Sequence, residues 1–273
     1  MWQPKGIQYT LKDIADQTGS VNNEPRIKHR FPSSSRMRTK KSSADRLLLP
    51  GLDIENTRAR NPKLEFVMAL LASKHWFGFD LDDTRHEFRK ASAYVSRSVF
   101  KTIQAIRPES TKTVEELEAT YREVLRSKTA TAFTDGRSSE NYRREGFSHL
   151  LDNHGYESSS ESLEKLLTVY QTSLRAALTL KPRALRLLEK LKASSRAVIV
   201  VTEGPQDAQE WTVSELGLKP FIDIFVTTND IGKSKVDGLF PAVLEKHNIA
   251  SGDMVYVGDN QQRVIPPSTS SRD

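Results

Sequence analysis

The sequence predicts an α/β fold, a doubly wound parallel sheet with helices on both faces and an inserted all-helical cap. Two observations lead to this prediction. From residue 182 onward, helical and apolar strand-like segments alternate in a βαβαβ order, which is typical of a parallel sheet covered by helices. In addition, a long helical region separates the first apolar strand, at 76–79, from the next one, at 196–205.

Local patterns predict the elements of the first half. PKLEFVMALLASKH (62–75) indicates a short helix that leads into the first strand. The segment 113–126 opens with Thr and has Glu three residues later, a capping box, and 159–178 is amphipathic with a Ser-rich start, so both are predicted helices. Between them, 129–147 is polar, and we interpret it as turn-like.

The second half alternates more regularly. An amphipathic helix precedes each of the last three strands, and Pro182 stands in the first turn of the first of these helices. The predicted helices are 182–194, 205–217 and 238–249, and the predicted strands after the first are 196–205, 223–230 and 253–260.

These elements divide the chain into a core in two parts and an insertion. We predict the core at 61–85 and 182–262 and the helical cap at 86–181. The segment 1–60 is rich in Ser, Asn, Pro and basic residues with little periodicity, and we predict that it is disordered. The polar stretch 263–273 is a predicted tail.

Charge and composition exclude several classes of function. The net charge is +6, but residues 1–60 hold 12 Lys or Arg against 6 Asp or Glu, whereas residues 61–273 hold 29 against 29. We therefore expect no nucleic acid to bind the folded part.

There is no cysteine, which excludes disulfides and cysteine-based zinc sites. No apolar run reaches the roughly 18 residues of a membrane span, and no secretory signal is evident. We expect no membrane partner and a cytoplasmic location, or a nuclear one directed by the basic segment.

Chemically distinctive side chains stand at or just after the ends of four predicted strands. Asp80 and Asp82 follow the first strand, Thr202 ends the second, Lys235 follows the third and Asp259 ends the fourth. Because ligands of an open parallel sheet bind beyond the carboxyl ends of its strands, we expect these residues to meet in one site. Neighbouring carboxylates repel, so a cation is expected among them. The alternative is that the acidic run only forms a turn and a helix cap.

The same residues carry a family resemblance. DLDDT at 80–84 resembles the DxDxT signature of the haloacid dehalogenase superfamily of hydrolases, and Thr202, Lys235 and Asp259 match its three later motifs. The resemblance runs from about residue 74 to 262 and implies the helical cap that follows the first strand. The form of the first motif is most similar to the nucleotidase-like branch of the superfamily.

The resemblance also implies a role for each site residue. Asp80 would attack phosphorus and form an aspartyl phosphate, while Asp82 would act as general acid and then general base. Mg²⁺ would be held by the carboxylates of Asp80 and Asp259 and by the backbone carbonyl of Asp82. Thr202 and Lys235 would bind the phosphoryl oxygens.

The function that follows is a Mg²⁺-dependent phosphatase acting on a small phosphorylated substrate, such as a nucleoside monophosphate. Asp82 favours a phosphatase over a 2-haloacid dehalogenase, because a halide leaving group needs no proton. Four neighbours receive plainer interpretations. We expect Asp83 to serve the turn, His86 to be structural or solvated, Arg89 to lie on a solvated helix face, and Lys233 to be a weaker candidate than Lys235.

The sequence departs from the family pattern at two places. Arg85 stands where a small or apolar residue is usual. After Asp259, Arg263 and Val264 occupy the region where the family supplies another acid, and no further strand follows. The last strand would then be an exposed sheet edge. The alternative function is therefore a catalytically impaired, shortened homologue that acts only by binding or self-association, with the oligomeric state open.

Overall fold

The computed structural model describes residues 9–10, 62–128 and 132–260. Most of the segment predicted to be disordered, and all of the predicted tail, lie outside the described residues. Within the described residues, no helix is long and apolar enough to cross a membrane.

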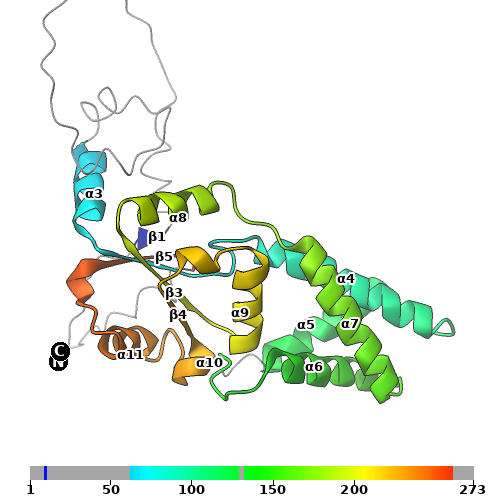
Figure 1. The fold of residues 1–273 in the computed structure, drawn as a ribbon. Helices are drawn as coiled ribbons and strands as arrows, with labels where there is room; N and C mark the ends of the chain where they lie inside the picture. The colour runs from blue at the N-terminus through cyan, green and yellow to red at the C-terminus, as the bar shows by residue number, and fades with distance from the viewer. Residues whose placement is uncertain (1–8, 11–61, 129–131, 261–273) are drawn as a thin grey trace, which may run out of the picture.

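Five parallel strands form one sheet in the order β1-β5-β2-β3-β4 (Figure 1). The register places Phe79 of β2 beside Val200 of β3 and Val257 of β5, so these strands end at the same edge of the sheet. The strands are β1 Tyr9–Thr10, β2 Trp76–Phe79, β3 Ala197–Thr202, β4 Ile224–Thr227 and β5 Met254–Gly258.

Helices cover both faces of the sheet, as a doubly wound fold requires. Val198 and Val200 pack with α3, α8 and α9 on one face, while Ile199 and Val201 pack with α10 and α11 on the other. This alternation follows from the period of two in a strand. The predicted fold class is thus confirmed. These helices are α3 Pro62–Ser73, α8 Ala184–Ala193, α9 Gln206–Glu215, α10 Thr228–Ile231 and α11 Leu239–Lys246.

Four of the helices between β2 and β3, α4 to α7, form a bundle at one side of the sheet (Figure 1). They enclose a separate apolar core that includes Phe100, Leu117, Phe147 and Leu166. The helices are α4 Phe88–Ile106, α5 Val114–Lys128, α6 Ser139–Asn153 and α7 Ser160–Ala177.

The bundle joins the sheet through two adjacent linkers and a docked loop. Glu87 N donates to Thr179 O at 3.0 Å, so the outgoing and returning chains run side by side. Before α6, a loop contacts the sheet domain: Thr228 Oγ1 donates to Ala132 O at 2.7 Å, and Asn229 Nδ2 donates to Phe133 O at 3.1 Å. The loop before α6 is therefore fixed beside the carboxyl end of β4.

The prediction of a turn-like segment at 129–147 is wrong from Ser139 onward, where α6 begins. Ser138 caps this helix by accepting from Asn141 N at 3.2 Å, and the backbone N and Oγ of Ser139 donate to the carboxylate of Asp207 in α9. Polar groups in the first turn of α6 thus gain hydrogen-bond partners, one of which is distant in sequence. The buried Phe147 comes only in the later turns of the helix.

The prediction that the last strand is an exposed sheet edge is also corrected. Two residues from the N-terminal segment pair with β5, with Tyr9 opposite Val257 and Thr10 opposite Gly258. The carboxyl end of β5, which leads to Asp259, therefore has a strand on both sides, and part of its backbone polar groups are paired.

Candidate active site

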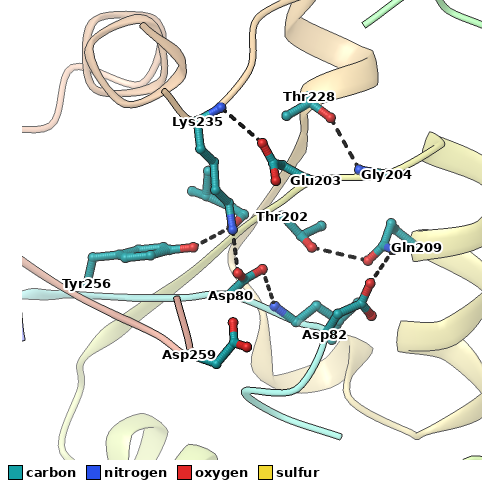
Figure 2. Close-up of polar contacts among 12 residues, drawn as sticks. Asp80, Asp82, Thr202, Glu203, Gly204, Gln209, Thr228, Lys235, Tyr256 and Asp259 are labelled. Atoms are coloured by element: carbon teal, nitrogen blue, oxygen red, sulfur yellow. Dashed lines mark hydrogen bonds and ion pairs between the residues drawn. The ribbon is translucent and has the colours of Figure 1, made fainter. Parts of the chain in front are cut away.

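Asp80 and Lys235 form a buried ion pair at the carboxyl end of β2. Lys235 Nζ donates to Asp80 Oδ2, and Asp80 Oδ1 accepts from the backbone N of Leu81 at 2.9 Å (Figure 2). Both side chains are almost fully enclosed. Burial raises the pKa of Asp80, and the charge and hydrogen bond of Lys235 act in the opposite direction. Lys235 therefore favours the ionised form of this carboxylate.

Two side chains fix the carboxylate of Asp82. His86 Nε2 lies 2.7 Å from Asp82 Oδ1, and Gln209 Nε2 donates to Asp82 Oδ2 at 3.2 Å. The amide of Gln209 also accepts at its Oε1 from the Thr202 hydroxyl at 3.3 Å. Gln209 thus joins the second acid of DLDDT to the threonine that ends β3, as Figure 2 shows.

Gly204 lets Gln209 approach so closely. Gly204 has φ of 150°, and a Cβ at this position would lie 2.7 Å from Gln209 Nε2. Its backbone N donates to Thr228 Oγ1 at 3.2 Å. The neighbouring Glu203 accepts from the backbone N of Lys235 at 3.3 Å and so holds the segment that carries the lysine (Figure 2).

Arg89 bridges the two remaining acids. Its Nε lies 3.2 Å from Asp83 Oδ2, and its Nη2 donates to Asp259 Oδ2 at 2.8 Å. Asp83 has φ of 52° and also accepts from the backbone N of Arg89 at 3.0 Å. Asp83 therefore serves the turn, whereas the expectation that Arg89 lies on a merely solvated face is wrong.

Arg85 lies next to this site without a carboxylate partner among the described residues. Its side chain is buried, its guanidinium carbon lies 3.6 Å from the centroid of the Phe79 ring, and its Nε has no hydrogen-bond partner there. Burial lowers the pKa of Arg85 from 12.5 to about 10.

The five predicted site residues all reach the same edge of the sheet. Asp80, Thr202 and Lys235 are buried, while Asp82 and Asp259 remain partly accessible. The competing Lys233 is exposed, so Lys235 is the lysine that contacts the first aspartate.

Four further residues contact this site. Sequence reasoning missed Glu203 and Gln209, and it gave His86 and Arg89 only structural or solvated roles. His86, Arg89, Glu203 and Gln209 each bond directly to one of the predicted residues. His86 and Arg89 stood close to the acidic run, but nothing in their spacing showed which carboxylate each would reach.

The oxygen atoms at this edge suit a hard cation such as Mg²⁺. Within the described residues, no three His, Asp or Glu side chains form a group that could hold a metal ion. The implied donor set is different, because it consists of the carboxylates of Asp80 and Asp259 and the backbone carbonyl of Asp82. One or two carboxylates, completed by water and substrate phosphate, are the usual Mg²⁺ environment in phosphoryl-transfer enzymes. The residues present therefore fit this ion.

A family model described as haloacid dehalogenase-like hydrolase matches residues 78–265, which include β3, β4, β5 and the last two residues of β2. The chain belongs to the haloacid dehalogenase-like hydrolases. The resemblance carried by DLDDT is thus confirmed at the level of the family. No match to a curated protein was found.

Solved structures similar to this hydrolase come from enzymes of different chemistry. A 2-haloacid dehalogenase from Pseudomonas syringae pv. Tomato has 23% identity and a TM-score of 0.51, covering 68% of this chain and 78% of its own. YfnB of Bacillus subtilis, a candidate HAD-hydrolase bound to magnesium, has 23% identity and a TM-score of 0.53, covering 68% and 80%. A candidate β-phosphoglucomutase from Thermotoga maritima has 19% identity and a TM-score of 0.50, covering 67% and 74%. These likenesses establish the shared fold.

A cavity of about 370 Å³ lies elsewhere, between α6, α7 and α9. Asp207 and Trp211 line it from one face of α9. Gln209, two positions from each of them, lies on the opposite face and points to the acidic site. This cavity is therefore separate from the carboxylates of DLDDT.

Proposed function

We propose that this hydrolase is a Mg²⁺-dependent phosphatase that cleaves a small phosphomonoester through an aspartyl phosphate on Asp80. The observation that best supports the proposal is the second acid. Asp82 has a carboxylate that is partly accessible and held by His86 and Gln209, next to the buried pair of Asp80 and Lys235. Hydrolysis of a phosphate ester needs such a group, because its leaving oxygen must be protonated.

Asp80 acts as the nucleophile in the first half of the proposed reaction. One of its carboxylate oxygens attacks phosphorus, a new O–P bond forms, and the bond from phosphorus to the ester oxygen breaks. Lys235 favours the ionised nucleophile before the attack, because its charge opposes the effect of burial on the pKa of Asp80.

Asp82 acts twice as a proton carrier. In the first half it donates its proton to the departing ester oxygen, which leaves as an alcohol. In the second half it accepts a proton from the water that attacks the phosphorus of the aspartyl phosphate. The bond from phosphorus to the Asp80 oxygen breaks, inorganic phosphate leaves, and both Asp80 and Asp82 return to their starting states.

Charge on the phosphoryl group is balanced by groups around it. Lys235 Nζ contacts Asp80 and is therefore within reach of the oxygens of a phosphoryl group bound there. The Thr202 hydroxyl donates to Gln209 in this structure and can turn to donate to a phosphoryl oxygen instead. Bound Mg²⁺, held by Asp80, Asp259 and the carbonyl of Asp82, would neutralise part of the phosphoryl charge and align the phosphate with the nucleophile.

The first test is hydrolysis by the purified full chain with Mg²⁺ or with a chelator. An aryl phosphate and a panel of nucleoside monophosphates and sugar phosphates serve as substrates, and Asp80→Asn is the inactive control. We expect phosphate release that needs Mg²⁺ and disappears in Asp80→Asn. Halide release from a 2-haloacid, without phosphatase activity, would replace this proposal with dehalogenase chemistry. A folded protein that releases neither product would contradict both.

A further inference from the structure

Arg89 is a cation already bound to the acidic site. Its guanidinium contacts Asp83 through Nε at 3.2 Å and Asp259 through Nη2 at 2.8 Å. The two carboxylates come from different elements, the turn after β2 and the end of β5, which lie side by side in the sheet. Arg89 therefore joins the first turn of α4, in the bundle, to the strand that carries Asp259.

The other acids of the site have other partners. Asp80 is paired with Lys235, and Asp82 is held by His86 and Gln209. Within residues 62–128 and 132–260, Arg89 is the cationic side chain in contact with Asp259. It thus neutralises an acid that the proposed function assigns to Mg²⁺.

A guanidinium and Mg²⁺ use the same carboxylate oxygens. The Arg89 side chain is 76% exposed, so solvent screens its attraction to Asp259 and the contact is easily broken. The side chain is also long and can turn into solvent without moving α4. The contact is therefore strong enough to occupy Asp259 and weak enough to be displaced by a divalent ion.

We propose that Arg89 is the counter-ion of Asp259 in the metal-free protein, and that it competes with Mg²⁺ for this carboxylate and thereby sets the metal affinity of the site. This inference rests on the proposed function, because it assumes that Asp259 is a Mg²⁺ ligand. It assigns to Arg89 a regulatory role in metal binding, which is separate from the chemistry of Asp80 and Asp82.

Calorimetric titration of MgCl₂ into the metal-free full chain tests the proposal. We compare the wild type with Arg89→Gln, and with Lys90→Gln as the matched control. Lys90 is exposed, is the next residue of the same helix, and has no carboxylate contact among the described residues, so both variants lose one positive charge. We expect Arg89→Gln to bind Mg²⁺ about two- to fivefold more tightly, while Lys90→Gln stays close to the wild type.

Thermal unfolding gives a second readout that does not depend on activity. Without metal, Arg89→Gln should melt at or below the temperature of the wild type, because Asp83 and Asp259 have lost their partner. Saturating Mg²⁺ should then raise its melting temperature by more than it raises that of the wild type, since tighter binding to the folded state gives greater stabilisation.

Three results would overturn the inference, and they separate it from the proposed function. Unchanged or weaker Mg²⁺ binding in Arg89→Gln, with binding intact in the wild type, overturns the role of Arg89 alone. Equal tightening in Lys90→Gln shows a general charge effect and also overturns it. No Mg²⁺ binding to any of the three proteins, each shown to be folded by circular dichroism, overturns both this inference and the metal requirement of the proposed function.

Discussion

His86 Nε2 lies 2.7 Å from Asp82 Oδ1, so a buried imidazole four residues further along the chain holds the proposed acid–base group. The other ring nitrogen, Nδ1, is buried and has no hydrogen-bond partner among the described residues. We infer that Nε2 carries a hydrogen and donates a hydrogen bond to the carboxylate. His86 is therefore a positioning residue for Asp82, together with Gln209.

Replacing His86 with Leu should lower kcat by about 10- to 100-fold and leave KM nearly unchanged. The orientation of Asp82 would be lost, and proton transfer by a well-placed acid is worth about 10² to 10⁴ in rate. His86→Gln keeps a donor near the position of Nε2 and should recover part of the loss. Steady-state kinetics on one substrate measure both. A rise in KM alone, or equal losses in the two variants, would show that His86 is only structural.

Arg85→Leu should stabilise the protein by about 1 to 3 kcal/mol. The lowering of its pKa from 12.5 to about 10 corresponds to a burial cost of roughly 3 kcal/mol, partly offset by the contact with the Phe79 ring. Because the folded-state pKa lies below the unfolded one, this cost is fully present below about pH 10. The gain should thus be constant from pH 6 to pH 9 in urea unfolding. A less stable Arg85→Leu protein would refute this interpretation.

Lys235→Met should abolish activity and destabilise the metal-free protein by about 3 to 5 kcal/mol at neutral pH, because it leaves the Asp80 carboxylate buried without its partner. The loss depends on pH. Without Lys235 the pKa of Asp80 rises further, and a raised folded-state pKa means that stability falls as pH rises from about 4 through that pKa.

Urea unfolding of Lys235→Met with a chelator, at pH 5 and at pH 7.5, checks this sign. The deficit relative to the wild type should be smaller at pH 5, where Asp80 can bind a proton. Lys233→Met is the control, since Lys233 is exposed, and it should remain active and stable. A deficit that is larger at pH 5 would contradict the assignment of Lys235 as the partner of Asp80.

Gly78→Ala should cost about 1 to 3 kcal/mol, which is typical of overpacking in a core. A Cβ on Gly78 would lie 2.8 Å from Cδ2 of Tyr256. Tyr256 is fully buried, and its hydroxyl donates to Val201 O at 2.7 Å, so the ring has no free direction in which to move. Gly252→Ala is the matched control, because nothing lies within 4 Å of its added Cβ. Equal unfolding free energies for the two variants would exclude the steric clash.

The regular part of the fold could be predicted because its period is visible in the sequence. The strands of the second half are short apolar runs between helices, and their order alone requires a parallel sheet. The helix α6 was missed because its first turns are polar and its buried side chains, Phe147, Leu150 and Leu151, come late. The pairing of Tyr9 with β5 was missed because two residues carry no periodic signal.

The candidate site could be predicted in part for a similar reason. Residues at the ends of parallel strands must meet, so Asp80 and Asp259 could be brought together from their positions in sequence. The contact between Arg89 and Asp259 could not, because it depends on how α4 leaves the sheet and spans 170 residues. The preference for Lys235 over Lys233 could be drawn from the sequence, and the structure agrees with it, because Lys235 is buried against Asp80 whereas Lys233 is exposed.

Detection of a phosphorylated intermediate tests the proposed role of Asp80 most directly. The Asp82→Asn variant is mixed with Mg²⁺ and an aryl phosphate, because an aryl leaving group needs little help from an acid. The reaction is then quenched in acid. We predict a phosphoryl group on Asp80, sensitive to hydroxylamine, because the variant lacks the base for the second half of the reaction. Asp80→Asn should carry none. Turnover by the wild type without any such intermediate, or labelling that persists in Asp80→Asn, would contradict the assignment of Asp80 as the nucleophile.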